Sequence, residues 1–219
     1  MDIKITLITI LIFSIIFHEY AHGWMALRSG DPTAKDAGRL TFNPIPHIDM
    51  MGTIILPVLL VVSGANVLFG WAKPVPVNPG NFRNPRLDNL KVSAIAPLSN
   101  LFLALMITIF TGILLYLSII NRSGLIYAIL MWGTRINILL AVFNLLPIYP
   151  LDGSHVLEYF IPRQYLVTYK KIQRAGPVIL MLLIVSGMTL RINLLFSIII
   201  PPTEAIFDFY QKILIFMGV

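Results

Sequence analysis

The chain has 219 residues, of which 57% are hydrophobic and only 12% are charged, and its mean hydropathy is +0.83. A soluble globular domain carries about 25% charged residues, so this composition excludes an ordinary water-soluble domain and favours a membrane protein. Cysteine is absent, which excludes disulfides, thiolate metal sites and a cysteine nucleophile. The net charge of +6 is explained by the basic loops of a membrane protein, without nucleic acid as a partner.

Four apolar runs predict membrane-spanning helices, because about 20 consecutive apolar residues cross the hydrocarbon core. They occupy residues 3–27, 92–119, 125–146 and 177–200. The polar turn 121–124 makes the second and third a helical hairpin. Pro201 and Pro202 are expected to stop the fourth run, and the mixture of acidic and aromatic side chains in 203–217 predicts an interfacial helix.

Residues 50–70 are apolar but broken by glycine and proline, and their uninterrupted apolar stretch is only about 9 residues long. They predict a re-entrant segment. If 50–70 crossed the membrane, the basic residues outside the spans would divide 9 against 5. If it re-enters, they divide 11 against 3, which is the stronger positive-inside bias. The favoured arrangement therefore has the N-terminus outside and the loops 28–49, 71–91 and 148–176 in the cytosol.

His18, Glu19 and His22 form the pattern His-Glu-x-x-His near the end of the first apolar run. The i, i+4 spacing places both imidazoles on one helical face, where they can share a zinc ion. Glu19 is placed beside such an ion, in the position of a general base that deprotonates the attacking water. Ionisable groups inside a span are costly, which favours a metal site over side chains that merely reach the membrane surface or bind loop residues.

A catalytic zinc site needs a third protein ligand. The candidates in polar breaks of the chain are His47, Asp49, Asp152, His155 and Glu158, whereas Asp31, Asp36 and Asp88 lie in charged loops and are expected to be solvated. Asp152 is the preferred ligand because it follows prolines that stop an apolar helix and precedes Gly153. It lies on the same side as His22 only if 50–70 re-enters. Capping the helix that follows is its alternative role, and the two roles are compatible.

Local structural roles are expected for several other polar residues. For His47 and His155 a local hydrogen-bonding role is favoured over metal binding, and for Asn100 a helix–helix hydrogen bond is favoured over a place in a cavity. The alternation in 38–43 suggests a short strand that offers its edge to an unwound substrate, with Gly38 and Asn43 as binding residues. A plain amphipathic loop is the alternative for this segment.

The two motifs, His-Glu-x-x-His at 18–22 and Asn-x-x-Pro-x-x-x-x-Asp-Gly at 144–153, resemble the site-2 protease family of intramembrane zinc metalloproteases. The resemblance spans most of the chain and is closest to the compact branch without PDZ or CBS domains. It is carried further by segments 17–23, 30–34, 38–44 and 69–77. One departure is Ala96, where relatives typically have glycine.

The resemblance implies an enzyme that cleaves a peptide bond within or beside a transmembrane segment of a membrane-anchored protein. His18, His22 and Asp152 would hold one Zn2+, Glu19 would be the base, and Asn144 would hold the substrate or polarise its carbonyl. Together with composition, it predicts an all-α polytopic membrane protein in the cell membrane, forming a single domain over 1–219. About four to five spans, a re-entrant segment and a short strand or hairpin near the active site are expected, with that site near the cytosolic face.

The sequence is also compatible with two alternatives to an active protease. A non-enzymatic membrane transporter or assembly factor could use the His and Asp residues to bind ions, because ionisable groups in spans also mark ion paths. A protease that has lost activity could keep zinc for structure, although the intact Glu19 argues against this. The expected partners are a membrane-anchored substrate and the lipid bilayer, and a homo-oligomer is left open.

Overall fold

The computed structural model describes residues 3–55, 59, 62, 71–189 and 194–219. Within these ranges the regular secondary structure is helical and no strand occurs, in agreement with an all-α membrane protein. The long helices are α1 (Ile3–Arg28), α4 (Pro85–Tyr116), α5 (Leu125–Asn144) and α9 (Leu194–Phe216). The shorter ones are α2 (Thr33–Asp36), α6 (Asp152–Phe160), α7 (Leu166–Gln173) and α8 (Gly176–Thr189), with 3-10 turns at Ile45–His47, Pro79–Asn81 and Arg163–Tyr165.

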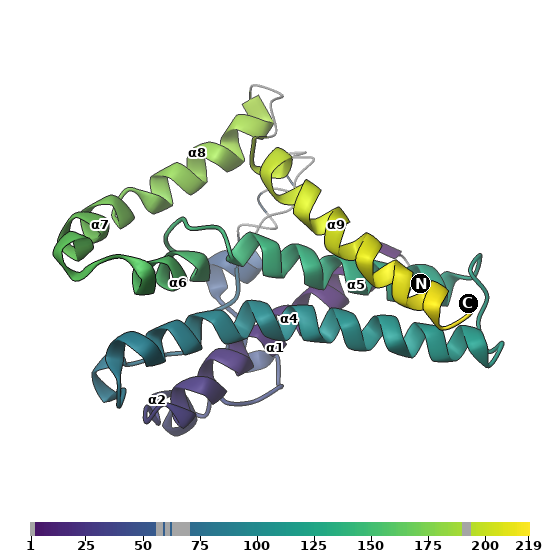
Figure 1. Cartoon of the computed structure of the whole chain (residues 1–219), viewed down its shortest axis with the longest axis horizontal. Coiled ribbons are helices and arrows are strands. Elements are labelled where there is room, and N and C mark those ends of the chain that lie inside the picture. Colours follow the sequence, from purple (N-terminus) through teal and green to yellow (C-terminus); the bar gives the residue numbers. More distant parts are fainter. Residues whose placement is uncertain (1–2, 56–58, 60–61, 63–70, 190–193) are drawn as a thin grey trace.

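Three of the described helices are long and apolar enough to cross a membrane, namely α1 from Ile5, α4 and α5. In Figure 1, α4 runs along the long axis of the molecule, and it packs against both α1 and α5. Helix α4 begins at Pro85, seven residues before the predicted span, because Asn84 caps it by accepting a hydrogen bond from the N–H of Leu87. Large apolar side chains such as Phe13, Phe102 and Phe110 remain exposed, as lipid-facing residues should.

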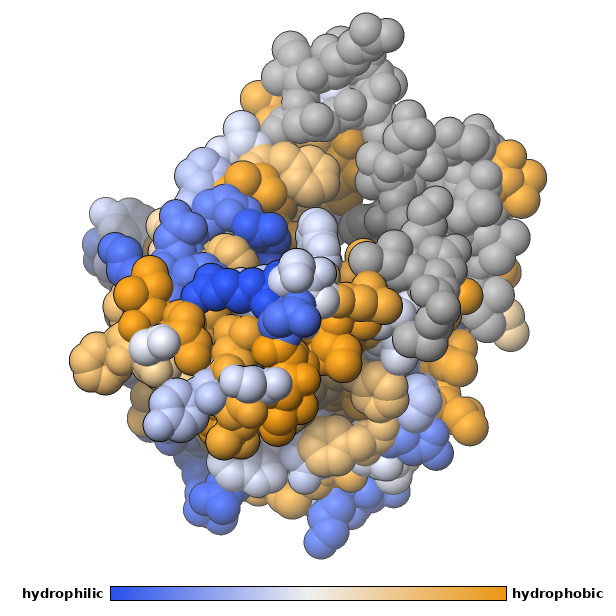
Figure 2. All heavy atoms as spheres, turned by 90° about the vertical axis from the view of Figure 1, so that its right-hand side faces the viewer, coloured by the Kyte–Doolittle hydropathy of each residue, from blue (hydrophilic) through white to orange (hydrophobic). Residues whose placement is uncertain are grey.

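The end of the molecule that carries both chain termini faces the viewer in Figure 2. Hydrophobic atoms reach the surface there, and hydrophilic atoms form a band across the middle of this face and further patches at its margin. The polar α4–α5 turn, which the sequence predicted, includes a hydrogen bond from the Ser123 hydroxyl to the side chain of Asn121. A polar turn at a bundle end is expected where two spans leave the hydrocarbon region.

The direction of the helices follows from the hydrogen bonds between them. Asn100 of α4 contacts Asn137 of α5, and Thr108 contacts Thr134, so α4 and α5 are antiparallel. Asn100 of α4 contacts the backbone carbonyl of Ser14 in α1, and Val92 of α4 contacts His22 of α1. The later residue of α4 thus meets the earlier residue of α1, so α1 and α4 are antiparallel too. Helices α1 and α5 therefore run in the same direction, which places the ends that carry His22 and Asn144 on one side.

The connection from α1 to α4 begins and ends at the same end of the bundle, because the N–H of Arg83 donates to the carbonyl of Ser29 at 3.1 Å. This connection therefore makes no net crossing. Of the predicted re-entrant segment 50–70, Met50–Ile55 forms a π-helical turn. Most of the remainder lies outside the described residues, so a re-entrant path remains a prediction.

The expected strand at 38–43 is wrong, and the described residues there form turns and bends. Gly38 has a φ of +65° and follows the end of α2, with its N–H donating to the carbonyl of Lys35. The Asn43 side chain accepts from the N–H of Ile45, and the Thr41 hydroxyl accepts from the N–H of Asn43. These side-chain hydrogen bonds replace those of a strand ladder.

The predicted stop at Pro201 and Pro202 is also wrong, since both prolines lie inside α9. One helix covers the end of the predicted span 177–200 and most of the predicted interfacial helix 203–217, and α8 is a separate helix. Packing explains the continuity: Leu195, Ile199 and Leu214 are buried, and α9 contacts α4 and α5. Neighbouring helices can compensate the backbone bonds that a proline removes. Neither α8 nor α9 is among the three described helices that are long and apolar enough to cross a membrane.

Asp31 and Asp88 are buried, at 0% and 4% exposure, although both were expected to be solvated, whereas Asp36 is exposed as predicted. The Asp31 carboxylate accepts hydrogen bonds from the backbone N–H groups of Thr33 and Asn78 and from the Asn81 amide. Burial raises the pKa of Asp31, but hydrogen bonds from Thr33, Asn78 and Asn81 outweigh burial and hold this pKa below its ordinary value. Asp31 thus ties the end of α1 to the segment preceding α4.

Candidate metal centre

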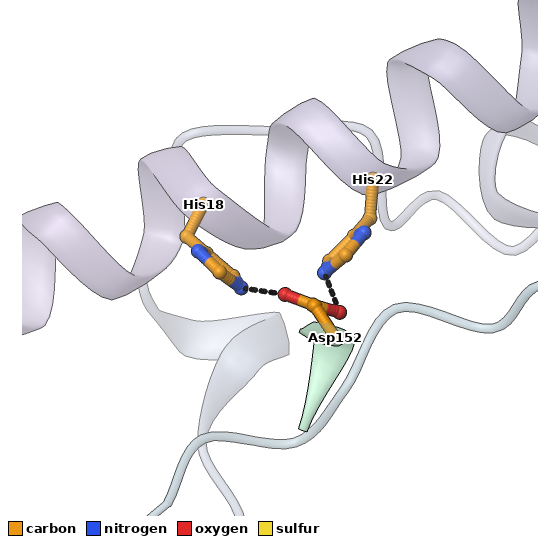
Figure 3. Close-up of side chains that lie close together, drawn as sticks. All are labelled: His18, His22 and Asp152. Carbon is orange, nitrogen blue, oxygen red and sulfur yellow. Dashed lines mark ion pairs between the residues drawn. The ribbon is translucent and has the colours of Figure 1, made fainter. Parts of the chain in front are cut away.

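Three ligand-type side chains meet between α1 and the start of α6. His18 and His22 lie one turn apart on α1, and Figure 3 shows both rings directed at the carboxylate of Asp152. The His18 Nε2 atom lies 3.1 Å from Asp152 Oδ2, and His22 Nε2 lies 3.2 Å from Asp152 Oδ1. One potential ligand atom from each residue falls within 4.8 Å of the others. The structure thus brings together the ligand set expected from sequence.

The turn between α5 and α6 places Asp152 next to the two histidines. Asn144 ends α5, and the following residues turn back with hydrogen bonds from Ile148 to Leu146 and from Leu151 to Ile148. Gly153 lies against the backbone carbonyl of Leu145, where a Cβ atom would collide. Asp152 is the first residue of α6 and Leu151 holds the N-cap position, so the carboxylate serves the cluster rather than a cap. The positive end of the α6 dipole favours an anion there.

The second ring nitrogen of each histidine is already engaged. His22 Nδ1 lies 2.8 Å from the carbonyl oxygen of Val92, which can only accept a hydrogen bond, so Nδ1 carries the proton. His18 Nδ1 lies 2.8 Å from Oδ1 of Asn100. When both Nδ1 atoms donate, both Nε2 atoms direct lone pairs at an acidic side chain. Such hydrogen bonds from the second nitrogen are typical of metal-ligating histidines.

The donor set fits a zinc ion. Two imidazole nitrogens and a carboxylate facing one another need a cation between them, and this combination with room for water is typical of catalytic zinc. His18, His22 and Asp152 would hold the ion, since each directs a ligand atom at the same small region. Burial raises the pKa of Asp152, but the positive charge of a protonated His22 and hydrogen bonds from His22 and His18 outweigh burial and hold this pKa below its ordinary value, and a bound cation would supply that positive charge in place of the protons. The carboxylate is therefore ionised at neutral pH.

Glu19 lies next to the cluster in sequence but is not one of its three members. Its Oε2 atom accepts a 2.7 Å hydrogen bond from the backbone N–H of Val75. The segment around Val75 is fixed in turn by Arg39, whose Nη2 donates to the carbonyls of Lys73 and Pro74 at 2.7 and 3.3 Å, and by His47, whose carbonyl accepts from the N–H of Lys73. This hydrogen bond fixes the position of the Glu19 carboxylate, which follows the cluster residue His18 on α1.

The predicted substrate-binding residues make local contacts. The Asn144 amide donates to the carbonyl of Leu140 within α5. Gly38 and Asn43 form the turns described above, and Phe42 between them stacks on Phe17 and Tyr20 of α1. This aromatic contact holds the turn segment against the helix that carries the histidine pair.

The remaining histidines are outside the cluster, and His47 forms the local hydrogen bond favoured for it, whereas the buried Nδ1 atom of His155 has no hydrogen-bond partner among the described residues. His47 is buried and its Nε2 lies 3.0 Å from the carbonyl oxygen of Thr41. His155 lies near Glu158 and packs edge-on to Tyr149. The Asp49 side chain accepts from the N–H of Gly52 at the start of the π-helical turn.

Sequence reasoning missed three supports of the site, namely the Val75 amide, the Val92 carbonyl and Asn137. Backbone groups leave no signal in side-chain patterns, so the first two could not have been found. Asn137 could have been noticed, because it is a polar residue within an apolar span, as Asn100 is. Asn100 forms the expected helix–helix hydrogen bonds and also contacts His18.

Residues 53–186 match a protein-family model described as "Peptidase family M50". This range contains Asn144 and Asp152 and begins after the histidine pair. The comparison with curated proteins gives "Putative zinc metalloprotease YwhC" of Bacillus subtilis, 42% identical over 161 residues, or 71% of this chain and 69% of the relative.

More distant relatives carry the same kind of name. "Putative zinc metalloprotease MJ0611" of Methanocaldococcus jannaschii is 38% identical over 144 residues, which is 66% of this chain and 64% of that protein. "Putative zinc metalloprotease Rip2" of Mycolicibacterium smegmatis is 30% identical over 148 residues, which is 67% of this chain and 54% of that protein. No solved structure matches.

Proposed function

This chain belongs to peptidase family M50, and we propose that it is an intramembrane zinc endopeptidase that hydrolyses a peptide bond within or beside a transmembrane segment of another membrane protein. Membership confirms the family resemblance found in the two motifs, and the chain is a membrane metalloprotease. The observation that carries the finer proposal is the position of the His18, His22 and Asp152 cluster, whose histidines lie on an apolar helix long enough to span the membrane.

The residues have distinct roles in the proposed hydrolysis. His18, His22 and Asp152 would hold one zinc ion per chain, which when bound supplies Lewis acidity for attack on the peptide carbonyl. Glu19 accepts the proton of the attacking water and passes it to the leaving amine. Since Oε2 of Glu19 is held by Val75, Oε1 is the atom available for this proton transfer.

Asn144 is the proposed substrate contact. One N–H of its amide is used by the Leu140 carbonyl, and an amide NH2 has a second N–H to donate. Asn144 ends α5, and the α5–α6 turn leads directly from it to Asp152. Its free donor could therefore hold the carbonyl of a substrate strand that has left its helical conformation, because unwinding exposes carbonyls that a helix conceals.

The orientation in the membrane is also proposed. The loops 28–49, 71–91 and 148–176 hold most of the basic residues outside the spans, and the positive-inside rule assigns such loops to the cytosol. The cluster lies toward the end of α1 from which these loops leave, so the active site would be near the cytosolic face of the cell membrane. Water needed for hydrolysis would enter from that side.

The test compares wild-type protein with Glu19→Gln in liposomes that contain epitope-tagged single-span membrane proteins. Cleavage is followed by immunoblot and bound zinc by elemental analysis. We expect Glu19→Gln to keep its zinc and to lose cleavage by at least about 100-fold, because general base catalysis contributes about 10² to 10⁴ in rate. Glu158→Gln is the matched control, since Glu158 lies on α6 outside the cluster and should be dispensable.

A zinc chelator should stop wild-type cleavage, and added zinc should restore it. Equal cleavage by wild-type protein and Glu19→Gln would contradict the proposed base. A wild-type protein that binds zinc and cleaves no single-span protein would instead favour the ion-binding alternative.

A further inference from the structure

A line of hydrogen bonds connects the cluster to the interior of the helix bundle. His18 Nδ1 of α1 lies 2.8 Å from Asn100 Oδ1 of α4, and Asn100 Nδ2 lies 2.9 Å from Asn137 Oδ1 of α5. Both asparagines are 0% exposed, and His18 is 7% exposed. The line therefore joins three packed helices through buried side chains.

Two backbone carbonyls determine how the asparagine amides are oriented. Asn137 lies 2.9 Å from the carbonyl oxygen of Gly133, and because this oxygen only accepts, the NH2 group of Asn137 must face it. The Asn137 oxygen then faces Asn100. Asn100 likewise lies 3.1 Å from the carbonyl oxygen of Ser14, so its NH2 group faces Ser14 and Asn137. Its oxygen is left for His18.

This orientation fixes the tautomer of His18. The Asn100 oxygen can only accept a hydrogen bond, so His18 Nδ1 must donate and carry the proton. Nε2 is then free of hydrogen in the neutral ring and directs its lone pair at the cluster. If the amide of Asn100 were turned over, its NH2 group would face Nδ1 and favour the opposite tautomer, with the proton on Nε2 where it blocks a metal.

We propose that Asn100 and Asn137 are positioning residues for the zinc ligand His18: Asn100 fixes its tautomer and ring orientation, and Asn137 acts through Asn100 by preventing the amide from turning over. The inference rests on the proposed function, because it takes His18 as a zinc ligand. Metal affinity is therefore coupled to the packing of α1, α4 and α5.

Thr108 and Thr134 provide a matched comparison within the same pair of helices. Their hydroxyl groups lie 3.4 Å apart, both residues are 0% exposed, and neither hydroxyl contacts the cluster. They are a buried polar pair between α4 and α5 that differs from the asparagines in having no connection to His18. Changing Thr134 to valine removes a polar contact of α5 about one turn from Asn137.

The test measures zinc affinity of the purified full-length protein by competition with a chromophoric chelator. We expect Asn100→Leu to weaken zinc binding by about 10- to 100-fold, as for other residues that orient metal ligands. Asn137→Leu should weaken it less, and the double variant should be no weaker than Asn100→Leu, because Asn137 acts only through Asn100. Thr134→Val should stay within about twofold of wild type. The absorption spectrum of the Co2+-substituted protein should change in the asparagine variants alone.

Unchanged zinc affinity in Asn100→Leu would overturn the proposal, as would losses that add fully in the double variant or an equal loss in Thr134→Val. If Asn100→Leu does not fold, Asn137→Leu decides the question by the same two measurements, since it leaves the direct partner of His18 in place. Failure of the proposed function gives a different result, because it shows as a wild-type chain that binds no zinc or as a Glu19→Gln variant that still cleaves.

Discussion

The carboxylate of Glu19 is held by the backbone N–H of Val75, at 2.7 Å and across 56 residues of sequence. Val75 lies between Pro74 and Pro76, which have no N–H, so it is the only backbone donor of these three residues. The proposed base is thus oriented by a segment that sequence motifs of the α1 helix do not include. The position of Glu19 depends on how this segment is held.

The Val75 amide can be removed by Val75→Pro, with Val75→Ala as the control that shortens the side chain and keeps the N–H. A hydrogen bond to a charged group contributes about 1.5–3 kcal/mol, so cleavage should fall by roughly 10- to 100-fold in Val75→Pro if the bond orients the base. Zinc content should be unchanged in both variants. Equal cleavage rates in the two variants would show that the bond does not matter for the reaction.

Arg39 is 8% exposed and holds the Val75 segment through the carbonyls of Lys73 and Pro74. Arg39→Leu should release this segment, raise amide hydrogen exchange at Val75 and lower cleavage, because the Glu19 contact is lost more often. Lys35→Leu removes a positive charge from an exposed position of α2 and serves as the control. Hydrogen exchange is measured by mass spectrometry on peptides that cover residues 71–77. An exchange rate in Arg39→Leu equal to that of wild type would contradict the expectation.

Asp152→Asn keeps the size of the proposed ligand and removes its negative charge. Zinc affinity should fall by at least about 100-fold, because loss of a ligand exceeds the 10- to 100-fold cost of losing a residue that orients one. Asp208→Asn, a change at an exposed position of α9, should keep wild-type affinity. Chelator competition on detergent-solubilised protein measures both, and wild-type affinity in Asp152→Asn would exclude this residue as a ligand.

Gly153→Ala tests the turn that delivers Asp152. The added Cβ would collide with the backbone carbonyl of Leu145, so the turn must open and the carboxylate must move. We expect weaker zinc binding and a lower melting temperature. Gly133→Ala in α5 is the control, since its Cβ would have only ordinary contacts, the nearest at 3.6 Å from Ile107. Similar behaviour of the two alanine variants would contradict the proposed role of the turn.

Asp31→Asn should destabilise the fold by about 2 kcal/mol at pH 7, because the carboxylate accepts several hydrogen bonds in its charged form. The pKa of Asp31 is lower in the folded protein than in the unfolded chain, so its contribution is fully present above pH about 4 and is lost as the pH falls through the folded-state value. The difference from wild type should therefore shrink at pH 3.

Thermal unfolding followed by tryptophan fluorescence at pH 7 and pH 3 measures this effect. Asp36→Asn, at an exposed position five residues further along, should match wild type at both values. A difference between Asp31→Asn and wild type that is as large at pH 3 as at pH 7 would show that the charge of Asp31 is not what stabilises the turn.

Particular residues show how far the sequence could be used. The ligand set His18, His22 and Asp152 could be predicted because helical spacing fixes the first two and a proline-rich break isolates the third. The expected strand at 38–43 failed because turn-forming contacts of Gly38, Thr41 and Asn43 are stronger local signals than a brief alternation. The helix end expected at Pro201 failed because packing on α4 and α5 maintains α9 across two prolines.

The sequence by itself was enough to predict a membrane protein, three of its long helices, its family and the residues of the cluster. Composition and the spacing of residues along one chain carry that information. Only the tertiary structure decided that Val75 holds Glu19 and that Asn100 and Asn137 contact His18 and one another. These relationships join groups that are between 37 and 82 residues apart. No local pattern encodes them, since they arise when packed helices leave each buried polar group only the partners that the fold provides.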